Sequence, residues 1–89
     1  MDRRERELLL EELDSRGFRL FAEQVVRRVH AWMAELVENA ELDEAKRKGY
    51  VNAIASLKEG MTGFYDQAGV SLPSWLDKEL NYYRNHDDA

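Results

Sequence analysis

The sequence predicts an all-α protein built on a long antiparallel helical hairpin. Apolar residues recur at alternating steps of four and three in two segments, which gives each of two helices one apolar side. The first set is Phe18, Ala22, Val25, Val29, Trp32 and Leu36, and the second is Tyr50, Ile54, Leu57, Met61, Phe64 and Ala68. Only a short stretch separates the segments, so we expect helices over about 18–40 and 43–68 that pack against each other.

A turn near Glu41 predicts a specific register for this hairpin. Antiparallel pairing about that point places large side chains beside small or complementary ones along the contact between the two long helices, which we call the seam. The expected pairs are Trp32 with Tyr50, Val29 with Ile54, Val25 with Leu57, Ala22 with Met61 and Phe18 with Phe64. At the start of the second long helix, Asp43 is a suitable cap for the free N–H groups.

A short helix is predicted before the hairpin, over about 2–14. This segment is rich in strong helix formers and carries Leu9, Leu10 and Leu13 on one side. We expect a kink or turn after it, with Gly17 in the left-handed conformation that ends a helix. A continuous helix through Arg16 is the alternative.

The second half of the chain contains four residues that shape its helices. Gly60 and Gly63 predict fraying or a bend near the end of the second long helix, or else the close approach of another backbone. Gly69 is the expected terminator, and Pro73 begins a last helix that extends to about residue 84. Residues 85–89 are polar, and we expect them to be frayed.

Size and charge limit the classes of protein to consider. The chain has 89 residues, no cysteine and a formal charge of −5, with both signs interleaved along it. These features predict one small domain over 1–89, stabilised by helix packing, a partner or self-association, and they argue against general nucleic-acid binding. No apolar run is long enough to cross a bilayer and no secretory core segment follows Met1, so we expect a cytoplasmic protein without a membrane partner.

No constellation of residues predicts catalysis, a metal site or a cofactor. His30 has neither a nucleophile nor an orienting carboxylate one turn away, so we interpret it as a surface or boundary histidine. His86 stands beside Asp87 and Asp88, but this polar tail has no fold to fix a metal's geometry. We therefore expect a protein that is not an enzyme.

Two regions are candidates for binding other proteins. One is the flank of the first long helix, whose broad apolar arc predicts contact with more than one neighbour. The other is the carboxy-terminal helix, which either folds back to cap the hairpin or binds a partner through its aromatic side chains. The candidate interface residues are Phe21, Val26, Met33, Val37, Trp75, Leu76, Leu80, Tyr82 and Tyr83.

The arrangement resembles small helical proteins encoded among the structural and packaging genes of tailed bacteriophages. The resemblance covers most of the chain and depends on Leu13-Asp14-Ser15-Arg16-Gly17-Phe18, on Lys48-Gly49-Tyr50 with Ile54 and Leu57, and on Leu72-Pro73-Ser74-Trp75-Leu76. It implies a role in virion assembly or head–tail connection, and a location in the host cytoplasm or in the virion.

These observations lead to three hypotheses about the function of the protein. The first is a non-enzymatic assembly or adaptor protein that binds itself, a larger protein or both; two hairpins would then form a four-helix arrangement. The second is a small acidic inhibitor of a host enzyme with a basic surface, which the net charge favours and the mixed charge distribution disfavours. A DNA-binding packaging subunit ranks third, because acidic residues accompany the basic ones on long helices.

Overall fold

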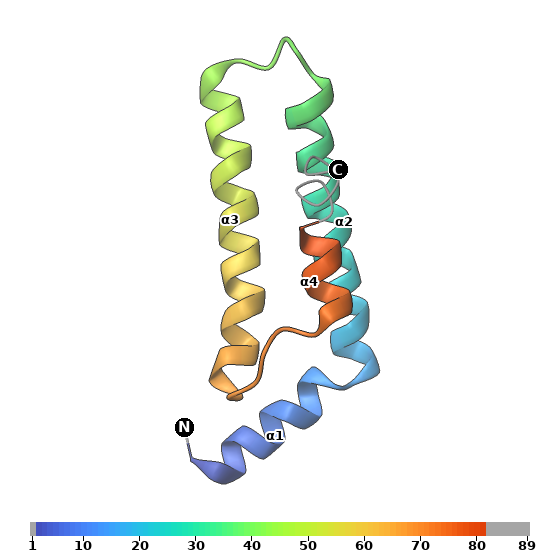
Figure 1. Ribbon diagram of the computed structural model, residues 1–89, viewed down its shortest axis with the longest axis vertical. Coiled ribbons are helices and arrows are strands. Elements are labelled where there is room, and N and C mark those ends of the chain that lie inside the picture. The colour runs from blue at the N-terminus through green and yellow to red at the C-terminus, as the bar shows by residue number, and fades with distance from the viewer. Residues whose placement is uncertain (1, 82–89) are drawn as a thin grey trace.

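The computed structural model describes residues 2–81 and consists of four helices within that range. They are α1 (Arg3–Leu13), α2 (Arg16–Glu38), α3 (Glu44–Gln67) and α4 (Ser74–Leu80). The long helices α2 and α3 lie side by side along the molecule, and α1 crosses the end of the hairpin where α2 begins (Figure 1). The predicted fold class is therefore confirmed, with the boundaries of the long helices shifted by one or two residues.

The chain turns between α1 and α2 at Asp14 and Ser15. The Ser15 hydroxyl accepts a hydrogen bond from the Phe18 N–H at 3.1 Å, so Ser15 caps the start of α2. The expectation that Gly17 is left-handed is wrong, because Gly17 lies inside the first turn of α2 and has no positive φ. Leu13 at the end of α1 is buried, as the leucine-rich side of this helix predicts.

Caps also define the two ends of α3. The Asp43 carboxylate accepts a hydrogen bond of 2.8 Å from the Lys46 N–H, which confirms the predicted cap. Gly69 follows the helix with φ 76°, a conformation that glycine adopts without a steric penalty, and the Val70 N–H bonds back to the Tyr65 carbonyl oxygen. The predicted terminator is confirmed. The helix continues through Gly60 and Gly63 to Gln67, so neither glycine ends it.

Aromatic contacts at the two ends of the hairpin fix its register. The Trp32 and Tyr50 ring centroids are 6.4 Å apart, and those of Phe18 and Phe64 are 6.0 Å apart in an edge-to-face arrangement. Both pairs agree with the predicted register. Between them, the buried residues of the seam include Ala22, Val25, Val29, Ile54 and Met61.

One predicted seam residue is rotated towards solvent. Phe64 is 40% exposed, whereas its neighbour Tyr65 is 5% exposed and belongs to the core. A side chain repeated every seven residues drifts about 20° per heptad around an undistorted α-helix. Phe64 lies two heptads after Tyr50, so it has drifted to the edge of the seam and Tyr65, one turn after Met61, replaces it.

Helix α4 folds back along α2, which confirms the capping arrangement. Its residues Leu76 and Leu80 are 0% and 1% exposed. The Arg19 guanidinium of α2 stacks on Trp75, and the His30 ring contacts the Glu79 backbone of α4. The sequence predicts the last helix from about Pro73 to about residue 84; α4 begins at Ser74, with Pro73 as its cap residue, and ends at Leu80. The tail expected to fray, 85–89, lies outside the described residues.

Candidate functional site

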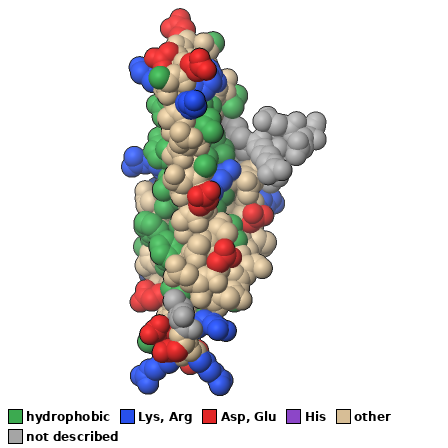
Figure 2. Space-filling view, turned by 90° about the vertical axis from the view of Figure 1, so that its left-hand side faces the viewer, with side chains coloured by type: hydrophobic (Ala, Val, Ile, Leu, Met, Phe, Trp, Pro, Cys, Tyr) green, Lys and Arg blue, Asp and Glu red, His purple; other side chains and the backbone are tan. Residues whose placement is uncertain are grey.

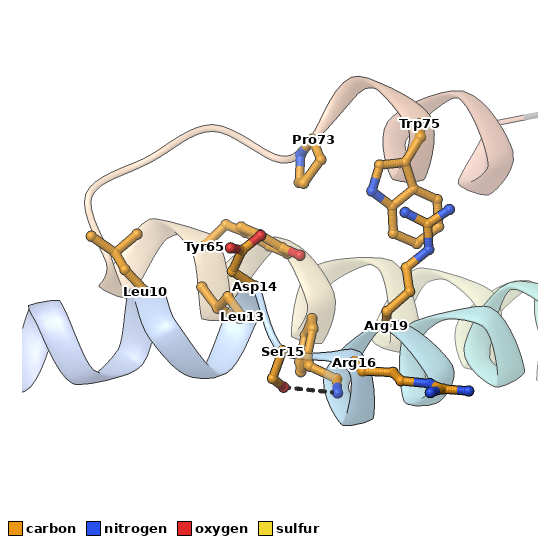
Figure 3. A pocket seen from close by; sticks show the side chains of 10 residues that line it. Leu10, Leu13, Asp14, Ser15, Arg16, Arg19, Tyr65, Pro73 and Trp75 are labelled. Atoms are coloured by element: carbon orange, nitrogen blue, oxygen red, sulfur yellow. Dashed lines mark hydrogen bonds between the residues drawn. The ribbon is translucent and has the colours of Figure 1, made fainter.

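An open groove lies where the four helices meet. Its volume is about 680 Å³, within the range of small-molecule and side-chain binding sites. Leucine, phenylalanine, proline and tryptophan side chains supply most of its apolar wall, and the polar groups come from the α1–α2 turn and α2 (Figure 3). The lining residues are Leu10, Leu13, Asp14, Ser15, Arg16, Phe18, Arg19, Tyr65, Pro73 and Trp75.

Tyr65 places one polar group in this mostly apolar surface. Its ring packs edge-to-face on Phe18, with centroids 6.0 Å apart, and its hydroxyl end points into the groove (Figure 3). Burial raises the pKa of Tyr65, the Arg19 charge opposes this change and the Asp14 charge reinforces it. The phenol therefore stays protonated near neutral pH and offers a hydrogen-bond donor, not a nucleophilic phenolate.

Arg19 and Trp75 form the side of the groove nearest α4. The guanidinium carbon of Arg19 lies 3.5 Å from the Trp75 ring centroid, a close cation–π stack. The Nε of Arg19 also contacts a Glu23 carboxylate oxygen at 3.2 Å, one turn along α2. These two contacts hold the guanidinium against the ring, so Trp75 is positioned by α2 although it belongs to α4.

His30 lies between α2 and α4 and links the two helices. Its Nε2 contacts the Glu79 backbone carbonyl oxygen, and the Glu79 carboxylate is 3.9 Å from the same nitrogen. The histidine side chain is 28% exposed. This placement agrees with the predicted boundary position, and the observed contacts tie α4 to α2.

The nine candidate interface residues fall into four groups. Val26, Leu76 and Leu80 are buried because α4 packs on α2, so a partner cannot reach them in this conformation. Met33 and Trp75 are partly buried against the core, whereas Phe21 and Val37 are 51% and 64% exposed. Tyr82 and Tyr83 lie outside the described residues.

Within residues 2–81, the other charged side chains considered do not come together to form a phosphate-binding or metal-binding site. The Arg47 guanidinium is bound to the end of α2 and does not join Lys46 and Lys48 in a phosphate-binding patch. Glu7 is paired with Arg3 at 3.4 Å on α1. The described residues contain no group of three or more histidine, aspartate or glutamate side chains arranged to hold a metal ion.

Sequence reasoning missed Tyr65 and Arg19 as parts of the groove. Arg19 does share one side of α2 with Glu23, Val26 and His30, since steps of three and four separate them. That side of α2 faces α4. The position of Arg19 on the same side as the apolar Val26 was therefore the available sign that Arg19 lies near another helix. Tyr65 gave no such signal, because Phe64 fits the repeating pattern better.

Comparison with protein-family models, curated proteins and solved structures gives no match. No helix in the described range has both the length and the apolar character needed to cross a membrane.

Proposed function

We propose that this protein is a non-enzymatic assembly or adaptor protein that binds other proteins through its helical surface, as an oligomer, in tailed-phage virion assembly or head–tail connection. The observation that carries the proposal is the groove between α1 and α4. It joins an apolar wall to a protonated tyrosine hydroxyl and to arginine side chains. The resemblance of the short motifs to phage structural and packaging genes supplies the biological setting.

The chemistry of the groove suits a segment of another protein. An inserted apolar side chain would cover Leu10 and Trp75, which are partly buried and already packed on the core. A carbonyl or carboxylate group beside it would accept a hydrogen bond from Tyr65 and lie near the positive charges of Arg16 and Arg19. Aromatic and arginine residues that become buried when a partner binds supply much of the affinity of protein interfaces.

Site-specific photo-crosslinking in the producing cell tests this proposal. A photoreactive phenylalanine analogue replaces Arg16, which is exposed on the rim of the groove, and a matched variant carries it at Lys48, exposed near the opposite end of the hairpin. We expect discrete adducts from position 16 that mass spectrometry identifies as virion structural proteins. The same adducts from both positions, or none from position 16, would refute the groove as the binding site.

The same measurement separates the alternative functions. Adducts with a host enzyme would support the acidic inhibitor instead, and binding of the two purified proteins should then weaken steeply as salt is raised. Adducts with DNA would support the packaging subunit.

A further inference from the structure

The side of the hairpin turned away from α4 is not covered by any described helix. We call it the open face. A shallow groove runs along it between α2 and α3, lined by Gln24, Val25, Arg28, Trp32 and Leu57. Phe21 and Phe64 are 51% and 40% exposed near one end of it. Figure 2, which views the molecule from the α3 side, shows hydrophobic side chains along the hairpin, with charged groups at its two ends and others between them.

The two helices present side chains of different size on this face. On α2, Phe21, Arg28 and Glu35 follow one another at heptad spacing and are all exposed. On α3 the residues of this face are small, and they are separated by alternating steps of four and three positions in the sequence. They are Gly49, Ala53, Ser56, Gly60 and Gly63.

The fold of one chain does not require these glycines. A Cβ atom added at Gly49, Gly60 or Gly63 would meet nothing within 4 Å, and none of the three has a positive φ. Each nevertheless costs about 1 kcal/mol of helix stability relative to alanine. Their common side gives room for bulky groups that come from outside the chain.

The bulky residues of α2 and the small residues of α3 stand at matching heights. The Trp32–Tyr50 and Phe18–Phe64 contacts set a register in which residue numbers across the hairpin add up to 82. Phe21 is therefore level with Gly60, to within one residue. At the other end, Glu35 is level with Lys46 on the same criterion, and both are exposed.

From these observations we infer that the open face binds a second copy of this chain, related by a two-fold axis parallel to the hairpin. Such an axis lays α2 over α3 of the partner at the same height. It sets Phe21 against Gly60 of the partner subunit and Glu35 against Lys46 of the partner subunit, and symmetry repeats both contacts. Large then meets small, and a negative charge meets a positive one.

The area of the open face is sufficient for such a dimer. Helix α2 has 23 residues, which corresponds to a length of about 35 Å at 1.5 Å per residue. Two helices packed 8–10 Å apart give the face a width of about 18 Å. Two copies would thus bury about 1,200 Å² in total, the lower end of stable interfaces. The result is a four-helix bundle with α4 on its outside.

Sedimentation equilibrium of the purified full chain at micromolar concentration tests this inference first. We expect twice the 10.4 kDa chain mass for the unaltered protein. Gly60→Glu should give a monomer that keeps its helical circular dichroism, since the new side chain has open space in a single chain and glutamate favours helix. Thr62→Glu adds the same charge at an exposed position off the open face and should stay dimeric. A monomeric unaltered chain, or a dimer unaffected by Gly60→Glu, would overturn the inference.

A charge exchange tests the orientation of the two copies. Glu35→Lys or Lys46→Glu alone should weaken the dimer several-fold, because like charges then meet at both symmetric contacts. The double variant should recover most of the affinity. If the unaltered protein, the two single variants and the double variant all dimerise with equal affinity, Glu35 does not face Lys46 of the partner subunit.

Disulfide trapping gives an independent test, because the chain contains no cysteine. A mixture of Arg28→Cys and Ala53→Cys proteins should form a mixed disulfide under mild oxidation, since these positions are level on opposing helices. Faster self-linking of Ser56→Cys would indicate that α3 packs on α3 and would overturn the proposed axis. The inference deepens the proposed function, but these assays use the purified chain alone, so their failure is distinct from a failure of the crosslinking in cells.

Discussion

The guanidinium Nη1 of Arg47 donates a hydrogen bond of 3.0 Å to the backbone carbonyl oxygen of Leu36, so a side chain of α3 closes the carboxyl end of α2. A second nitrogen of the same group lies 3.5 Å from the Asn39 carbonyl oxygen. Leu36 lies in the last turn of α2, where carbonyl groups lack partners within the helix, and the Asn39 carbonyl oxygen also accepts a hydrogen bond from the Leu42 N–H at 3.3 Å. A positive charge is favourable at this end of the helix dipole. Arg47 thereby joins the two long helices beside their turn.

Replacing Arg47 by glutamine should lower the free energy of unfolding by about 1–2 kcal/mol, because the carbonyls lose a charged donor. Urea denaturation followed by circular dichroism measures the change. Lys48→Gln removes a neighbouring exposed charge and should change stability by less than about 0.5 kcal/mol. Equal effects of the two substitutions would contradict a specific role for Arg47.

Removing the cap of α3 should have a cost of similar size. Asp43→Ala takes away the acceptor for the Lys46 N–H, and caps of this type contribute about 1 kcal/mol. Asp43→Asn keeps an acceptor oxygen and should retain most of the stability in the same denaturation experiment. The prediction fails if alanine and asparagine destabilise the protein equally.

Packing of α4 should depend on its buried leucines. Leu76→Ala removes a side chain that is 0% exposed and should cost about 2–5 kcal/mol, a large part of the stability of a small domain. Val37→Ala, at a side chain 64% exposed, should change the unfolding free energy by about 0.5 kcal/mol or less. Thermal unfolding of both variants checks the difference, and a mild effect of Leu76→Ala would mean that α4 is not part of the folded core.

The stack of Arg19 on Trp75 should be visible in tryptophan fluorescence. In a Trp32→Phe background, Trp75 is the remaining tryptophan, and Arg19→Gln should change its emission and destabilise the protein by about 0.5–1 kcal/mol. Lys48→Gln removes an exposed charge near the opposite end of the hairpin, far from the stack, so it serves as the control. Unchanged emission in the Arg19 variant would show that the stack does not form in solution.

Stability should fall in alkali through Tyr65. Its pKa in the folded protein is raised above the usual value of 10.0, so the folded state holds the proton more tightly than the unfolded state. The resulting stabilisation is fully present below pH 10.0 and is lost as the pH rises through the folded pKa. Urea unfolding from pH 8 to about 11 should therefore show a steeper decline for the unaltered protein than for Tyr65→Phe. Tyr50→Phe should leave the decline intact. If Tyr65→Phe loses stability with pH as steeply as the unaltered protein, Tyr65 is not the group responsible.

Much of the hairpin could be predicted from the sequence because its determinants are local. Asp43 and Gly69 act within one turn of the residues they cap, and the apolar repeat of α2 and α3 identifies the side that each helix buries. The register followed from the length of the turn, and the Trp32–Tyr50 contact confirms it. The groove could not be predicted in this way, because its lining comes from all four helices.

The sequence by itself determined the helices, the hairpin and the chemical character of its sides. Only the tertiary structure decided that α4 covers Val26, that Tyr65 enters the core in place of Phe64, and that Arg47 closes α2. The physical reason is distance along the chain. Helix periodicity and capping depend on residues three or four apart, whereas the contact of His30 with Glu79 joins residues 49 positions apart, and its formation depends on how whole helices pack.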